Sequence, residues 1–85
     1  MEFEHYTFPA VFTWYDKGVS IDFPDLPGCC SCAENFRKAV KSAREVLHLH
    51  LAGMIMDDEQ IPEASDIENI PRAEGDLVAL IEVEL

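Results

Sequence analysis

The feature that most constrains the fold of this chain is a single segment with helical periodicity, residues 36–56, set among segments with strand character. Its apolar side chains recur at helical spacing and fall within about 60° of one another around the helix axis. This stripe consists of Phe36, Val40, Ala43, Leu47, Leu51 and Met54. Asn35 precedes it and is a favourable N-cap residue. One such helix can cover one face of a small sheet, so the sequence predicts an α+β domain.

Strand formers dominate on both sides of the helix. Residues 5–14 are rich in aromatic and β-branched side chains, and residues 19–23 alternate between apolar and polar, so we expect a hairpin that turns at Gly18. Residues 29–33 can add a short third strand. Pro9 favours an edge position or a bulge in the first strand, whereas the largely apolar residues 76–85 predict a last strand at the centre of the sheet. The predicted fold is a small, mainly antiparallel sheet of three or four strands with one main helix on one face.

The charge of the chain restricts its partners. It has 85 residues, enough for one domain over residues 1–85, and its 17 acidic and 6 basic side chains give a net charge of −11. Nucleic acid and anionic membranes should repel such a chain, whereas a basic protein should attract it. We expect a partner to dock on the acidic side chains Asp57, Asp58, Glu59, Glu63, Asp66 and Glu68. The alternative is a solvated acidic surface that aids solubility.

A second apolar patch on the helix suggests self-association. Leu49, Ala52 and Met56 lie on the side opposite to the core stripe. Since one helix on a small sheet cannot bury both of its sides, we expect a homo-oligomer, most simply a homodimer, with these residues at the interface. In the alternative, residues 61–70 fold back and cover the patch with Ile61, Ile67 and Ile70.

The cysteines and the N-terminus favour a cytoplasmic protein. Cys29, Cys30 and Cys32 are too crowded for a disulfide framework, so we expect reduced thiols. The three cysteines with His48 or His50 could bind zinc, but structural zinc sites usually combine one closely spaced cysteine pair with a second, distant pair of ligands, and this pattern is absent from the sequence. No stretch approaches the ~18 apolar residues of a membrane helix, and the first ten residues do not form a signal peptide.

Catalysis by this chain has little support in the sequence. The candidate for Mg²⁺ binding in nuclease chemistry is a set of three acidic side chains, Asp22, Asp25 and Glu34. Their spacing does not require such a site, and the net charge would repel a nucleic-acid substrate. We therefore expect no enzymatic activity, no catalytic residue, no metal and no cofactor.

Two runs resemble the HicB-type antitoxins of bacterial and archaeal toxin–antitoxin pairs. They are F-P-A-V-F at residues 8–12 and G-V-S-I-D-F-P-D-L-P-G-C at residues 18–29, and the resemblance spans about residues 6–85. It continues through Ala39, Ala43, His50-Leu51, Ile61-Pro62 and Ser65. The resemblance implies a partial RNase H-like fold without nuclease activity. It also implies a partner: a small basic HicA toxin with a double-stranded-RNA-binding-like fold, which cleaves mRNA and whose active site the antitoxin covers.

The chain departs from that family in two places. Longer members commonly carry a DNA-binding module after this domain, whereas this sequence stops at Leu85, so we expect no DNA binding by this chain. Members often have acids at the helix start, where this chain has Arg37 and Lys38. Besides the antitoxin function, two alternatives stay open: a stand-alone homo-oligomeric HicB-like protein without a toxin partner, and a degenerate RNase H-like nuclease that uses Mg²⁺.

Overall fold

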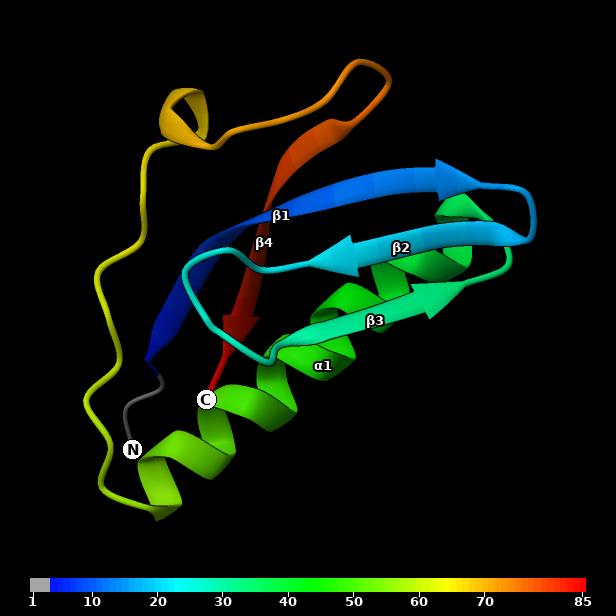
Figure 1. The fold of residues 1–85 in the computed structure, drawn as a ribbon. Coiled ribbons are helices and arrows are strands. Elements are labelled where there is room, and N and C mark those ends of the chain that lie inside the picture. Colours follow the sequence, from blue (N-terminus) through cyan, green and yellow to red (C-terminus); the bar gives the residue numbers. More distant parts are fainter. Residues whose placement is uncertain (1–3) are drawn as a thin grey trace.

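A four-stranded sheet with one long helix on one face forms the fold (Figure 1). The computed structural model describes residues 4–85. The elements are β1 (His5–Tyr15), β2 (Gly18–Asp22), β3 (Cys30–Ala33), α1 (Phe36–Met56), the 3₁₀ helix η1 (Ile67–Asn69) and β4 (Leu77–Glu84). The strand order is β3-β2-β1-β4, and every neighbouring pair is antiparallel. This confirms the predicted α+β class and its single main helix.

The positions of the first and last strands were predicted wrongly. β1 is central because it pairs with both β2 and β4, and β4 lies at an edge. Glu4 and Leu85 exchange two backbone hydrogen bonds of 2.9 and 2.8 Å, and in an antiparallel ladder such pairs alternate with pairs that exchange none. The pair of Pro9 with Leu80 is of the second kind, so the nitrogen of Pro9 points away from β4. On that side β2 has already ended, at Asp22 opposite Val11. The sheet tolerates the proline because no strand stands beside its missing N–H.

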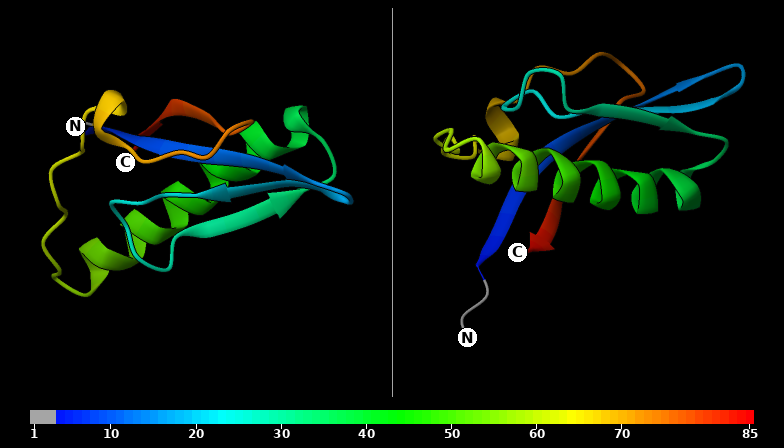
Figure 2. Two further views of the ribbon diagram at one scale, coloured as in Figure 1. Left: turned by 45° about the horizontal axis from the view of Figure 1, so that its top comes forward. Right: turned by 90° about the horizontal axis from the view of Figure 1, so that it is seen from below.

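β4 is apolar on both faces although it is an edge strand. Ile81 and Val83 belong to the core under α1. Val78 is buried on the opposite face, where η1 contacts β4 and Ile70 is also buried. The long connection between α1 and β4 crosses this second face, so the sheet lies between it and the helix (Figure 2). Cover from two sides therefore produced the pattern that we took for a central strand.

α1 begins and ends where the sequence predicts. The Oδ1 atom of Asn35 accepts a hydrogen bond of 2.9 Å from the backbone N–H of Lys38, which caps the first turn. The helix continues through Gly53 to Met56. Its buried side chains are Ala39, Ala43, Leu47 and Leu51. Phe36, assigned to the core stripe, is 39% exposed; it lies at the edge of the core, between the buried Phe12 and the exposed Trp14.

Two consecutive turns form the loop between β2 and β3. The amide of Leu26 donates to the carbonyl of Phe23 at 3.0 Å, and the amide of Cys29 donates to the carbonyl of Leu26 at 2.9 Å. Each turn has a proline in its second position, and Gly28, with φ of 87°, occupies the third position of the second turn. Phe23, Leu26 and Cys29 are each 1% exposed. The F-P-D-L-P-G-C run therefore places one core anchor at every third residue.

Candidate partner-binding surface

The acidic side chains that the sequence indicated all lie on the surface. Asp57, Asp58, Glu59, Glu63, Asp66 and Glu68 are exposed. They follow the C-terminal end of α1 and run along the connection drawn in yellow in Figure 1. Their carboxylates are open to solvent, and docking on them stays a prediction.

A pair of hydrogen bonds ties this connection to the turn after β2. Asp25 accepts from the Ser65 hydroxyl at 2.6 Å and from the Ser65 backbone N–H at 2.8 Å. Ile61 packs against the core nearby. These contacts attach the connection to the domain at Ile61 and Ser65, between the two ends of the acidic run. Nothing in the sequence spacing indicated this pairing.

The three carboxylates of the nuclease alternative do not come together. Asp25 is occupied by Ser65, and Asp22 is exposed at the end of β2, opposite the first residue of β3. Glu34 follows the last residue of β3, at the other end of the sheet, and pairs with Lys38 at 3.3 Å. Within residues 4–85, no three histidine, cysteine or acidic side chains are grouped to hold a metal ion.

The cysteines occupy two different environments. Cys29 is buried, its Sγ lies 3.8 Å from the carbonyl oxygen of Val46, and burial raises the pKa of its thiol to about 11. Cys30 and Cys32 are exposed on the edge strand β3, and all three are free thiols. His48 is exposed and His50 is half-buried.

The second apolar patch on α1 remains open to solvent. Leu49 is 71% exposed and Met56 is 86% exposed, whereas Ala52 is half-buried. Ile70 is buried on the far face of the sheet, and Ile61 packs against the core. The returning segment therefore leaves Leu49 and Met56 uncovered, and the fold-back alternative is wrong.

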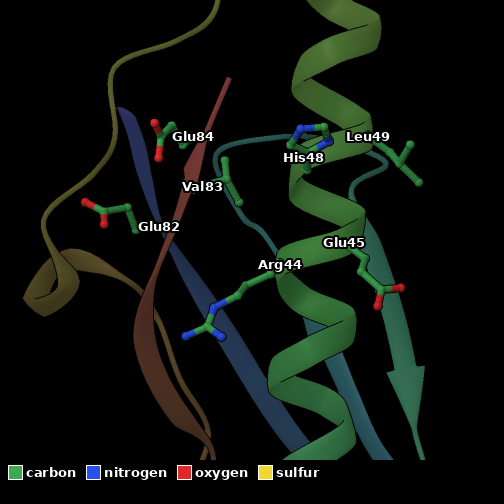
Figure 3. A pocket seen from close by; sticks show the side chains of 7 residues that line it. All are labelled: Arg44, Glu45, His48, Leu49, Glu82, Val83 and Glu84. Carbon is green, nitrogen blue, oxygen red and sulfur yellow. The ribbon is translucent and has the colours of Figure 1, made fainter. Parts of the chain in front are cut away.

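A groove of about 520 Å³ runs between α1 and the edge strand β4 (Figure 3). Val83 points from β4 toward the helix, whereas Glu82 and Glu84 lie on the other side of the strand. Arg44 extends from α1 toward β4. The full lining is Arg44, Glu45, His48, Leu49, Glu82, Val83 and Glu84. Sequence reasoning missed this groove because it assigned β4 to the middle of the sheet.

Within residues 4–85 no helix is long and apolar enough to cross a membrane.

Comparison with known proteins gives one family. Residues 8–85 match the HicB_like antitoxin of bacterial toxin–antitoxin systems. An uncharacterized 14.9 kDa protein from the rep-hol intergenic region of Haemophilus phage HP1 is 31% identical over 81 residues. That alignment covers 92% of this chain and 61% of the phage protein, so the chain spans about three fifths of its relative's length.

Three solved structures share the fold. The N-terminal domain of the Burkholderia pseudomallei antitoxin HicB has a TM-score of 0.76 at 27% identity, with 94% of this chain and 100% of that chain covered. A chain of the HicA3 and HicB3 toxin–antitoxin complex has a TM-score of 0.72 at 22% identity, covering 88% and 94%. A chain of a toxin–antitoxin complex from Streptococcus pneumoniae has a TM-score of 0.82 at 20% identity, covering 93% and 69%. The family match over residues 8–85 and this shared fold agree, and the chain belongs to the HicB-like antitoxin family of bacterial toxin–antitoxin systems.

Proposed function

We propose that this chain neutralises a small, basic, mRNA-cleaving toxin of the HicA type by binding over the toxin's active site. The family match over residues 8–85 carries the proposal. Two of the structures that share the fold come from toxin–antitoxin complexes, which supports a toxin as partner. The net charge of −11 suits a basic partner. The inhibition requires no catalysis by this chain, since occupation of the toxin's active site is sufficient.

Long-range electrostatics gives the acidic connection a role in this binding. Six exposed carboxylates lie between Asp57 and Glu68, on a segment that the Asp25–Ser65 contact holds in place. A cluster of one sign attracts a basic protein before contact and raises the association rate, an effect that salt weakens. We therefore assign Asp57, Asp58, Glu59, Glu63, Asp66 and Glu68 to the encounter with the toxin.

Self-association accompanies this proposal. Leu49, Ala52 and Met56 form the interface of a homodimer, because Leu49 and Met56 are large apolar side chains that the chain itself leaves exposed. Sedimentation decides the point: a species of 9.6 kDa at every concentration would exclude the dimer. If a dimer is present, Leu49→Glu should weaken it, whereas Glu45→Gln, at an exposed position one turn away, should leave it intact.

The proposal places the protein in the cytoplasm, with mRNA, as a single HicB-like domain without a DNA-binding function of its own. Its basic residues are few: four of the six lie on α1, with Glu34 just before the helix and Glu45 within it. A gel-shift titration should show no sequence-selective binding to operator DNA at physiological salt. Selective binding there would contradict this part of the proposal.

Co-expression tests the main proposal. The chain should restore growth to cells that express the small basic protein of the neighbouring reading frame, and the two should co-purify without ribonuclease activity. Ribonuclease activity in a saturated complex would refute the proposal, as would failure of the two proteins to bind.

Stopped-flow association at two ionic strengths tests the electrostatic part. Replacing Asp57, Asp58 and Glu59 by their amides should slow association several-fold at low salt. The matched amide variant at Asp16, Asp22 and Glu74, three exposed acids outside the segment, should have a smaller effect. Equal effects would show that only the overall charge matters.

A further inference from the structure

We propose that the open edge of β4 is the docking strand: an extended segment of the basic toxin pairs with it and becomes a fifth strand of the sheet. The inference rests on the proposed function and names the contact that this function uses. It starts from the position of β4, which has β1 on one side and, within residues 4–85, no strand on the other.

The register shows which groups an incoming strand would meet. Glu4 and Leu85 exchange both of their backbone hydrogen bonds, and in an antiparallel pair such residues alternate with residues whose N–H and C=O point outward. The outward-facing residues of β4 are therefore Val78, Leu80, Glu82 and Glu84. Unpaired edge groups of this kind are a template for strand addition. The opposite edge, β3, is only half as long, with 4 residues against 8.

The groove beside β4 can accept side chains from one face of the incoming strand. It has a volume of about 520 Å³ and lies between β4 and α1. Val83 supplies apolar lining on the β4 side, whereas Leu49, at the far rim, points from α1 away from β4. Alternate side chains of an added strand would point to this side, and apolar ones there would pack beside Val83.

Charge defines the other face of the incoming strand. Glu82 and Glu84 are exposed on the side of β4 away from α1, and Leu80, on the same face, is 56% exposed. β4 itself carries no basic side chain. Lysine or arginine directly opposite a glutamate makes a favourable cross-strand pair. The occupant is thus a strand that alternates basic residues with apolar ones, as a basic protein can supply.

A second copy of this chain fits the edge less well. A twofold contact between two β4 strands places each surface against itself. Four glutamates, Glu82 and Glu84 from each copy, would then share one ladder that contains no base. The like charge of these glutamates opposes self-pairing and favours a partner that places basic side chains opposite them.

Amide exchange in the complex tests the inference directly. The sample is this chain, labelled with ¹⁵N, in complex with the unlabelled basic protein of the neighbouring reading frame. The backbone amides of Leu80, Glu82 and Glu84 should exchange quickly in the free chain and at least tenfold more slowly in the complex. Unchanged exchange at these amides within a stable complex would overturn the inference and leave the proposed function standing. Absence of any complex would instead refute the proposed function, and protection by this chain alone at high concentration would assign the edge to a second copy.

A proline variant supplies an independent test. Glu82→Pro removes an outward-facing N–H without removing a β1–β4 hydrogen bond, and edge strands tolerate proline at such positions. It should weaken toxin binding at least tenfold, whereas Glu82→Gln, which keeps the N–H, should weaken it only a few-fold. Equal affinities of the two variants would overturn the inference. Thermal melts test whether both variants are folded. If the proline variant is unfolded, the exchange experiment on the unmodified chain decides the inference.

Discussion

Asp25 accepts two hydrogen bonds from Ser65, forty residues further along the chain, one from its hydroxyl at 2.6 Å and one from its backbone N–H at 2.8 Å. The carboxylate projects from the first of the two turns that follow β2. Together with the packing of Ile61 against the core, it attaches the connection between α1 and η1 to the rest of the domain. The turn sequence and the acidic connection therefore form one structural unit.

Removing this contact should destabilise the fold by an amount that depends on which partner is changed. Hydrogen bonds to a charged group contribute about 1.5–3 kcal/mol each, less where water has access. We expect Ser65→Ala to cost about 1 kcal/mol and Asp25→Ala about 2 kcal/mol, because the alanine at position 25 loses both bonds. Urea unfolding measures the two costs. Asp66→Ala is the control, since no side-chain hydrogen bond caps η1 there, and an equal cost for Asp66→Ala would contradict the assignment.

Two glycines should respond to alanine in opposite directions. A Cβ atom at Gly18 would lie 2.1 Å from the carbonyl oxygen of Ala33, so Gly18→Ala should force β2 and the end of β3 apart and cost several kcal/mol. At Gly53, inside α1, a Cβ meets no atom within 4 Å, so Gly53→Ala should stabilise the helix by up to about 1 kcal/mol. Thermal unfolding of both variants tests the pair, and a stable Gly18→Ala variant would show that this approach is not tight.

The buried thiol should make the protein less stable at alkaline pH. Burial raises the pKa of Cys29 from its ordinary value of 9.0 to about 11. Between these values the unfolded chain loses the proton and the folded chain keeps it, so the unfolded state binds fewer protons and the free energy of unfolding falls as pH rises. Cys29 is 1% exposed, but solvent outside the small domain still screens the thiolate, so we expect a loss of about 1–2 kcal/mol. Cys29→Ala should lower the slope of stability against pH in this window, and an unchanged slope would contradict the prediction.

Trp14 offers an optical report on the start of α1. It is the one tryptophan of the chain, and its ring stacks on Phe36 with centroids 5.7 Å apart and planes 19° apart. Phe36 also meets Phe12 edge to face at 5.3 Å. Phe36→Ala should expose the indole, shift its emission to longer wavelength and cost about 1–2 kcal/mol. Phe36→Leu keeps apolar cover and should shift the emission less, whereas unchanged emission in both variants would show that the stacking is absent in solution.

Sequence patterns predicted the elements of the fold but not the order of its strands. Asn35 and the helical period located α1, because capping and amphipathicity are local properties. Strand order depends on pairing between distant segments, and two local signals were misleading here. Pro9 lies in a part of β1 that pairs with β4 alone. The second face of β4 carries the buried Val78 because the segment that contains Ile70 covers that face. A proline or an apolar run reports the immediate surroundings of a strand, and a central strand can have an open side over part of its length.

The candidate surface was predictable to a similar degree. The exposed acids and the uncovered Leu49 and Met56 follow from composition and helical geometry, which need no knowledge of the fold. The Asp25–Ser65 contact and the groove at β4 require the tertiary arrangement, since each joins residues that are far apart in the chain. Features carried by one element were therefore visible in the sequence, and features shared by two were not.

The pairing of β1 with β4 has a consequence for synthesis. Residues 5–15 emerge from the ribosome well before residues 77–84, yet they form the central strand that the late segment must complete. During that interval a nascent chain has β2, β3 and α1 available but presents one side of β1 unpaired, beside the apolar side chains of Phe8 and Ala10. Contacts between such distant segments form slowly. Newly made molecules should thus pass through a period of sensitivity to proteases and chaperones that ends only when β4 has joined the sheet.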